Sequence, residues 1–186
     1  MNKSINSIIL IVLVLYFKGY FQMRYFNILP TINIYPSNEV EVIKVKNFVD
    51  ENNKYYLDIF KKTDDTVVNA FQEMVEMNRD DLNNIAQSPH LLFICLFLKT
   101  FINRARPKSV FTKLNVQLSK TANTPAYPSG HCMQAYYLAK QLSIKYPDKE
   151  NELFKLAEDC ALARVYAGLH YPSDNDFAKY ISLNIL

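Results

Sequence analysis

Apolar residues recur at the spacing of an α-helix along most of this chain, and no segment alternates apolar and polar residues as a half-buried strand would. Residues typical of helix ends bound these stretches, such as Ser37 and Ser88 before them and Pro107 and Pro147 after them. With only 3 Gly in the chain, architectures rich in β-turns are disfavoured. The sequence therefore predicts an all-α fold, a compact helical bundle.

Capping residues and prolines mark where the expected helices begin and end. Ser, Thr, Asp and Asn side chains accept the free N–H groups of a first turn, and the residue before a proline is biased away from helix. The expected helices run from Ser37 through Phe60, from Thr63 to Asn78, from Ser88 to about Ala105, from Ser129 to about Tyr146 and from Asp148 to near Gly168, with a short last helix opening at Ser173. Residues 107–127 are expected to form a loop.

The composition is that of one globular domain with a hydrophobic core. The chain has 186 residues, of which 49% are hydrophobic and 21% charged, and its net charge is +3. That charge is too small to indicate a nucleic-acid partner, so none is expected. Cys95, Cys132 and Cys160 all lie in apolar helical patterns without zinc-like spacing, which predicts that they are small core residues.

An apolar run lies near the N-terminus, from Ile8 to Phe17, with no charged residue between Lys3 and Lys18. It is shorter than the roughly 20 residues that span a bilayer comfortably and about as long as the apolar core of a secretory signal. No cleavage site of small residues follows it. We therefore expect an uncleaved signal anchor or tether over 1–22 and a helical domain over 23–186. A cleaved signal and a buried strand or helix are the alternatives.

This N-terminal run sets the expected location of the protein. It predicts a membrane-tethered or exported protein that associates with the membrane through Ile8 to Phe17. Basic residues flank the run on both sides, so the positive-inside rule does not fix the side of the membrane. No later segment is expected to span, because the eight apolar residues from Leu91 to Leu98 suit a core helix.

Two basic residues, Lys99 and Arg106, stand near the end of the helix expected from Ser88. Their separation of seven residues is close to two helical turns, which predicts that both side chains lie on one face. A lysine on an apolar stripe must extend to solvent or find an anion. The pair is therefore either a solvated helix end or part of an anion site.

The sequence Pro128-Ser129-Gly130-His131 stands where another helix is expected to begin. The first N–H groups of a helix have no internal partner and carry the positive end of its dipole, which favours an anion. Gly130 allows close approach, and the Ser129 hydroxyl can add a hydrogen bond. His131, in the first turn, is positioned to transfer a proton. A plain helix cap is the alternative interpretation.

Arg164 falls on the apolar stripe of the next expected helix, where an unpaired charge is costly. The fold or a ligand must therefore supply an anion. Gly168 can reverse the chain so that His170 projects back toward Arg164. Pro172 disfavours a helix joining His170 to Asp174, so we expect a turn in which the carboxylate holds one imidazole nitrogen and leaves the other as a nucleophile. Alternatively, Asp174 caps the last helix beside a surface histidine.

These three segments, in this order, resemble the type 2 phosphatidic-acid phosphatase superfamily. Its signature joins Lys-x6-Arg-Pro, Pro-Ser-Gly-His and Ser-Arg-x5-His-x3-Asp, and the likeness here runs from Lys99 to Asp174. The superfamily includes soluble class A acid phosphatases, membrane lipid-phosphate phosphatases and vanadium haloperoxidases. This chain departs from the signature at Ala163, where the family has Ser, and so loses a possible hydrogen bond near the phosphate.

The resemblance implies a role for each matched position. The phosphate oxygens would be bound by Lys99, Arg106, Ser129, Gly130 and Arg164. His170 would attack phosphorus and form a phosphohistidine, and Asp174 would orient it. His131 would protonate the leaving alkoxide and later activate water. No metal and no other cofactor is implied, since the cations and the helix start neutralise the charge of the transition state.

The function that the resemblance implies is a metal-independent phosphatase of phosphate monoesters, either soluble or lipid phosphates. Membrane lipid phosphatases have several spanning helices, whereas this chain has one candidate span, so the likeness is closer to the soluble acid phosphatases. A vanadate-dependent haloperoxidase is an alternative, because vanadate mimics phosphate in the same pocket. A non-catalytic, membrane-tethered phosphate-binding module is another, which Ala163 favours. The natural substrate and the oligomeric state are left open.

Overall fold

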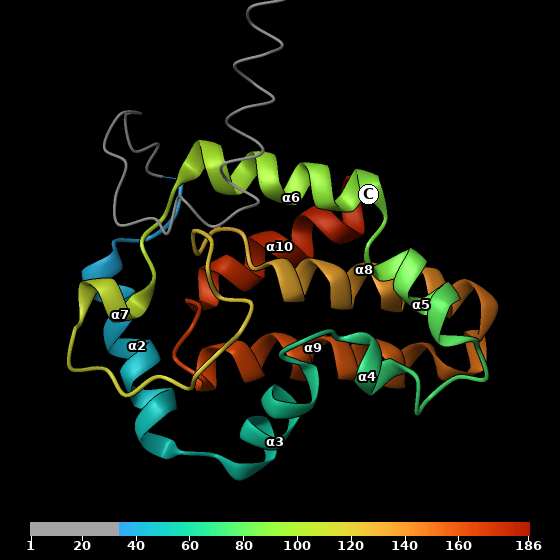
Figure 1. Cartoon of the computed structure of the whole chain (residues 1–186), viewed down its shortest axis with the longest axis horizontal. Helices are drawn as coiled ribbons and strands as arrows, with labels where there is room; N and C mark the ends of the chain where they lie inside the picture. Colours follow the sequence, from blue (N-terminus) through green and yellow to red (C-terminus); the bar gives the residue numbers. More distant parts are fainter. Residues whose placement is uncertain (1–33) are drawn as a thin grey trace, which may run out of the picture.

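The computed structural model describes residues 34–186, which form helices joined by turns, with no strand in that range (Figure 1). This confirms the expected all-α fold. The described helices are α2 (Asn38–Glu51), α3 (Lys54–Thr63), α4 (Val68–Phe71), α5 (Arg79–Ala86), α6 (Pro89–Ile102), α7 (Pro107–Val110), α8 (Gly130–Lys145), the 3-10 helix η1 (Pro147–Lys149), α9 (Glu150–Tyr166) and α10 (Pro172–Asn184). The signal anchor expected over 1–22 lies outside the described residues.

Helices α8 and α9 form the centre of the bundle, and α10, α5 and α6 pack against α8 while α3 and α4 pack against α9 (Figure 1). The two central helices are joined only by η1, so they run antiparallel. Between them lies the main core cluster, which includes Met133, Leu138, Leu142, Leu153 and Ala157. Cys95, Cys132 and Cys160 are free and buried, as expected of core residues.

The first expected helix is in fact two helices. Ser37 caps α2 as predicted, through a hydrogen bond from Val40 N to its Oγ. The helix ends at Asn52, which adopts the left-handed conformation with φ 50°, a conformation that asparagine tolerates at a helix end. The prediction of one continuous helix was therefore wrong. The break lets α3 turn toward α9.

The second helix, expected from Thr63 to Asn78, does not form as predicted. Thr63 is the last residue of α3 rather than a cap, and its hydroxyl donates to Ile59 O at 2.7 Å. Asp64 and Asp65 then form a bend instead of a first helical turn. The short α4 follows, and Asn78 caps a separate α5. The bend directs Asp64 into the interior of the bundle, where its charge has a partner that local sequence does not reveal.

Helix α6 begins as predicted and ends earlier than predicted. Ser88 caps it and Pro89 is its first residue, but it stops at Ile102 because Asn103 is left-handed with φ 50°. Arg106 is extended, as the residue before a proline prefers, and Pro107 opens α7. Lys99 and Arg106 therefore do not share a helix face, and the prediction made from their spacing of seven residues was wrong.

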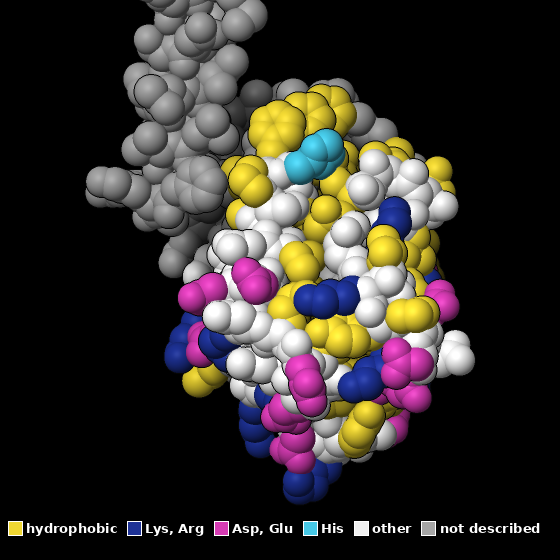
Figure 2. Space-filling view, turned by 90° about the vertical axis from the view of Figure 1, so that its right-hand side faces the viewer, with side chains coloured by type: hydrophobic (Ala, Val, Ile, Leu, Met, Phe, Trp, Pro, Cys, Tyr) yellow, Lys and Arg dark blue, Asp and Glu magenta, His cyan; other side chains and the backbone are white. Residues whose placement is uncertain are grey.

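The expectation that α6 is a core helix holds for one face only, where Leu91, Cys95 and Ile102 are buried. Phe93, Phe97 and Phe101 are exposed, and their rings stack along one face with centroids 6.3 and 6.0 Å apart. Figure 2 shows hydrophobic side chains gathered at the top of the molecule, where α6 lies in Figure 1. By length and composition, Arg79–Val110 is apolar enough to cross a membrane, and only 28% of its most apolar window is buried. A second apolar segment therefore exists beyond the N-terminal run.

The C-terminal helices lie close to their predicted places. Helix α9 follows η1, so Asp148 lies in the 3-10 turn and does not cap it, which corrects that expectation. The chain reverses at Gly168, where φ is 75° and an added Cβ would lie 2.8 Å from Val116 Cγ1. Only glycine fits such a turn without strain. Helix α10 then begins at Pro172, one residue before the predicted Ser173.

Candidate active site

Asp174 does two things at the start of α10. Its Oδ2 accepts a hydrogen bond from the backbone N–H of Tyr171 at 2.8 Å, which caps the helix, and it lies 3.1 Å from His170 Nδ1. Asp174 therefore both caps the helix and contacts His170, and the alternative of a surface histidine was wrong. Asp174 and His170 are buried. The cap fixes the carboxylate and the carboxylate fixes the ring.

The contacts of His170 define which ring nitrogen carries the lone pair. Its Nε2 lies 3.1 Å from Arg106 NH1, which also donates to Leu169 O at 2.8 Å. A guanidinium only donates, so Nε2 accepts and Nδ1 carries the proton that faces Asp174. Burial, followed by the positive charges of Arg106, Lys99 and Arg164, lowers the pKa of His170 well below its ordinary value. The ring is neutral, with its lone pair on the Arg106 side.

Arg104 holds the outer oxygen of Asp174. Its guanidinium is fully buried and donates to Asp174 Oδ1 at 2.7 Å and to Glu41 Oε2 at 2.8 Å. Glu41 in turn accepts from Ser173 N at 3.2 Å, which ties α2 to the start of α10. Burial raises the pKa of Asp174 and Arg104 opposes that shift. The sequence did not indicate Arg104 or Glu41 as residues of the site. A helix continued to Ala105 would not direct Arg104 and Arg106 into one site.

Lys99 and Gly130 meet at the start of α8. Lys99 is buried, its Nζ donates to Pro125 O at 2.6 Å, and its Cε lies 3.8 Å from where a Cβ on Gly130 would stand. Burial lowers the pKa of Lys99 to about 8, and Arg106 acts in the same direction. The backbone N–H of Ser129 donates to Asp174 O at 3.1 Å. The structure thus joins the Ser-Gly turn to the His170 turn by the main chain.

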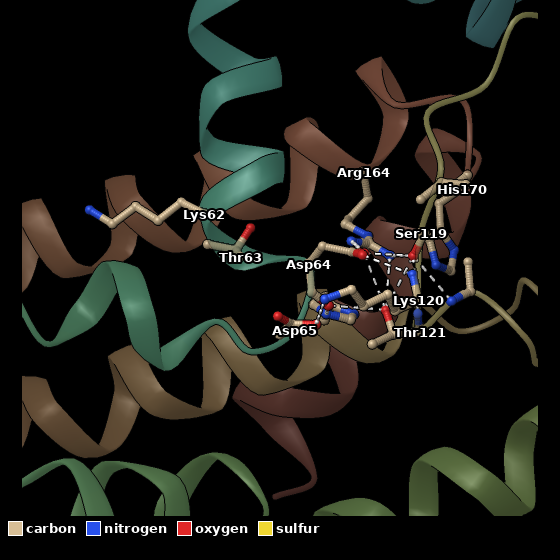
Figure 3. A network of polar contacts seen from close by, with 12 residues as sticks. Lys62, Thr63, Asp64, Asp65, Ser119, Lys120, Thr121, Arg164 and His170 are labelled. Carbon is tan, nitrogen blue, oxygen red and sulfur yellow. Dashed lines mark hydrogen bonds and ion pairs between the residues drawn. The ribbon is translucent and has the colours of Figure 1, made fainter.

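Arg164 is buried and finds its anion within the protein. Its NH1 donates to Asp64 Oδ1 at 2.8 Å, and its NH2 lies 3.4 Å from Ser119 Oγ and 3.5 Å from Thr121 Oγ1 (Figure 3). Partial burial raises the pKa of Asp64, but hydrogen bonds from Ser119 and Arg164 outweigh it and lower that pKa to about 2. Sequence analysis predicted that Arg164 needs an anion and did not name Asp64, which lies 100 residues away.

The backbone of the same turn contacts His131. His131 Nε2 lies 2.9 Å from the carbonyl oxygen of Asp64. A carbonyl only accepts, so Nε2 carries the proton in this arrangement. Burial and then the charge of Arg164 lower the pKa of His131 to about 3, and the ring is neutral. Asp64 therefore contacts two of the predicted site residues, one through its side chain and one through its backbone.

Two predicted phosphate ligands have donors without a partner. Ser129 Oγ and Arg164 Nε are buried and make no hydrogen bond within the described part of the chain. Buried donors of this kind are rare in folded proteins and point to a ligand. Ala163, by contrast, is fully buried in an apolar cluster with Phe60, Ala167 and Leu169.

Two pockets open beside these residues. One of about 370 Å³ is lined by Arg106, Ser119 and Leu169, among others. The other, of about 220 Å³, is lined by Gly130 and His131 and by residues of the α3–α4 turn, α6 and the Thr121 loop. Among residues 34–186, no group of three or more His, Cys, Asp or Glu side chains is placed to hold a metal ion. The groups that line the site are cations, imidazoles and a helix start.

The structure brings the predicted residues together from distant parts of the chain. His170 lies 3.1 Å from both Asp174 and Arg106, and the positive charges of Lys99 and Arg164 also lower its pKa. No protein with a curated description matches the chain. The sequence model of the PAP2 superfamily matches residues 90–184, just over half of the 186 residues. That span covers α6 to α10 and every predicted site residue, and the chain belongs to the PAP2 superfamily.

Proposed function

We propose that this chain is a metal-independent phosphoric monoester hydrolase that acts through a phosphohistidine intermediate. Membership of the PAP2 superfamily supports phosphatase activity in general. The observation that carries the finer proposal is the His170 ring, with Nδ1 held 3.1 Å from Asp174 and Nε2 3.1 Å from Arg106. A neutral imidazole held by Asp174 in this way offers its Nε2 lone pair to an electrophile once Arg106 NH1 turns from Nε2 to a phosphate oxygen.

The phosphate would be bound by Lys99, Arg106 and Arg164 with the Ser129 hydroxyl and the Gly130 amide. The unpartnered Ser129 Oγ and Arg164 Nε supply donors that no group in the described chain uses. Phosphoryl transfer depends mainly on neutralising charge that spreads over the phosphate oxygens. Three cations and the N-terminus of α8 provide that neutralisation in a buried site.

The chemical step follows from the two imidazoles. His170 Nε2 donates its lone pair to phosphorus while the bond to the alcohol oxygen breaks, and that oxygen takes a proton from His131. Asp174 stabilises the positive charge that develops on the His170 ring. Water then attacks the phosphohistidine and loses a proton to His131, which releases inorganic phosphate and restores His170. The dianionic phosphate is expected to offset Arg164 and raise the low pKa of His131 in the complex.

The test is hydrolysis of p-nitrophenyl phosphate by the full chain in the presence of a metal chelator. We predict that His170→Ala lowers the rate of hydrolysis by several orders of magnitude, because no other group replaces the nucleophile. His90→Ala is the matched control, since His90 is exposed on α6. Acid quenching of the wild-type reaction with a ³²P-labelled substrate should trap label on the protein, and His170→Ala should not trap it.

Three other outcomes would redirect the proposal. Full activity in His170→Ala would remove His170 as the nucleophile. Phosphate binding without turnover of any ester would identify a non-catalytic module. Activity with peroxide and halide, seen only after addition of vanadate, would identify a haloperoxidase.

We also propose that the protein associates with a lipid surface. The predicted contact through Ile8 to Phe17 lies outside the described residues, but the exposed phenylalanines of α6 support the same partner. Leu91, Leu92 and Cys95 of α6 also line the pocket that contains Gly130 and His131. The apolar wall that Leu91 and Leu92 give this pocket fits a phosphate ester with an apolar alcohol, such as a lipid phosphate.

A further inference from the structure

The turn between α3 and α4 contacts Arg164 and His131, two groups that the proposed reaction uses. The Asp64 carboxylate receives NH1 of Arg164 at 2.8 Å, the hydroxyl of Ser119 at 2.5 Å and the backbone N–H of Lys120 at 2.9 Å. Its backbone carbonyl lies 2.9 Å from His131 Nε2. Figure 3 shows Asp64, Arg164, Ser119 and Thr121 converging on one point from different segments, with His170 beside them.

These contacts are the ones expected of a substrate. A phosphate oxygen would receive the guanidinium of Arg164, and the leaving oxygen would receive the proton of His131. Asp64 presents a carboxylate to Arg164 and a carbonyl oxygen to His131. One residue thus occupies both the anion position and the proton-acceptor position.

Residues of this turn and of the 119–121 loop line the two pockets beside the site. Ser119 lines the pocket that contains Arg106, and Thr121 and Asp65 line the pocket that contains His131. Ser119 and Thr121 are the side chains that bond Asp64. The Asp64 turn and the 119–121 loop therefore border both pockets.

We propose that Asp64 is an intramolecular competitor for the phosphate site, and that its turn must leave Arg164 and His131 before a phosphate ester can bind. This inference rests on the proposed function. Residues 64–67 lie between α3 and α4, so the turn belongs to neither helix, and its polar contacts run to the 119–121 loop, to Arg164 and to His131. A dianionic phosphate carries more charge than one carboxylate and has more acceptor oxygens, so it can displace Asp64. A weakly charged ester cannot, and the turn thereby favours monoesters.

The experiment is calorimetric titration of inorganic phosphate into the full chain. Removing the charge in Asp64→Asn should tighten phosphate binding by about tenfold or more, which corresponds to a wild-type turn that is open in roughly a tenth of molecules. The kcat/KM for p-nitrophenyl phosphate should rise with it. Asp58→Asn is the matched control, because Asp58 is exposed on α3, lines neither pocket, and makes a surface ion pair of 3.7 Å with Lys61. It should bind phosphate as the wild type does.

Unchanged or weaker phosphate binding in Asp64→Asn would overturn the proposal, since a residue that merely positions Arg164 would give that result. Failure of both the wild type and the variant to bind phosphate would overturn it too. If Asp64→Asn does not fold, Ser119→Ala removes one bond to the turn and keeps the ion pair with Arg164. It should tighten phosphate binding in the same direction by a smaller factor, and weaker binding would count against the proposal.

The two proposals fail in different ways. If Asp64→Asn binds phosphate more tightly but neither protein hydrolyses any ester, the competitor role stands and the phosphatase proposal fails. If the wild type hydrolyses esters and Asp64→Asn binds phosphate no better, the phosphatase proposal stands and the competitor role fails.

Discussion

The guanidinium of Arg104 lies between two carboxylates that would otherwise face each other in the interior. It is buried against Asp174 at 2.7 Å and Glu41 at 2.8 Å, and the rings of Tyr35 and Tyr171 lie 4.1 and 3.9 Å from its Cζ. We predict that Arg104→Met lowers the free energy of unfolding by about 3–5 kcal/mol, because it leaves buried charge uncompensated. Urea unfolding measures this loss, and hydrolysis should be lost with it because Asp174 is released.

An exposed arginine provides the control for that variant. Arg79 makes its hydrogen bonds at the surface, to Asn69 at 2.6 Å and Gln72 at 2.9 Å. Arg79→Met should change the free energy of unfolding by about 0.5 kcal/mol or less. A similar loss in the two variants would show that Arg104 contributes no more than a surface hydrogen bond.

At the scale of elements, local chemistry predicted the helix starts better than the helix ends. Ser37 and Ser88 cap their helices, and α8 runs from Gly130 to Lys145 as the Ser129 turn and Pro147 indicated. The ends depend on Asn52 and Asn103, which adopt the left-handed conformation. Asparagine tolerates the left-handed conformation but does not require it. The spacing of apolar residues therefore predicted that both helices extend further than they do.

The exposed face of α6 belongs to this scale as well. Phe93 and Phe97 are 69% and 58% exposed, so replacing both with Ser should leave folding intact. We predict that this double variant loses on the order of tenfold or more in binding to phosphatidylcholine vesicles, because each ring would bury apolar area in the lipid surface. Vesicle flotation of the full chain measures the loss.

Helix α2 offers a control with matched exposure. Val40 and Ile43 are 57% and 61% exposed on that helix, away from α6. Replacing both with Ser should leave vesicle binding unchanged. Equal losses in the two double variants, or no loss in either, would contradict a role for the α6 face.

At the scale of the whole molecule, the spacing of residues along the sequence predicted the site residues. It did not predict the residues that pair with them. The order of Lys99, Arg106, Ser129 and Arg164 along the chain was enough to expect one anion site. In the fold the three cations lower the pKa of His170, and the Ser129 amide bonds Asp174. Asp64 pairs across 100 residues with Arg164, and Glu41 pairs across 63 with Arg104. Such pairs form when the bundle closes, and no local pattern encodes them.

The charge of the assembled site predicts opposite trends of activity and stability with pH. Burial lowers the pKa of Lys99 to about 8 from its ordinary 10.5, so its cation is present below that pH and lost above it. We predict that kcat/KM for p-nitrophenyl phosphate falls above about pH 8. Between about 8 and 10.5 the unfolded chain holds a proton that the folded chain has released, so the stability contributed by Lys99 rises with pH.

A pH–rate profile with parallel thermal unfolding measures both trends. In Lys99→Met the rise in stability that belongs to this residue should be absent. A kcat/KM that stays flat from about pH 7 to about pH 10 would show that the Lys99 cation does not contribute to substrate capture.

The hydrogen bond of 3.1 Å from the Ser129 amide to the Asp174 carbonyl joins the first residues of α8 and α10. This bond between peptide groups sets the distance from the His170 turn to the start of α8, and substitution of side chains does not remove it. Residues that line the two pockets can therefore differ between related proteins, and with them the alcohols that the proposed phosphatase would accept, while the spacing of His170 and the start of α8 is kept.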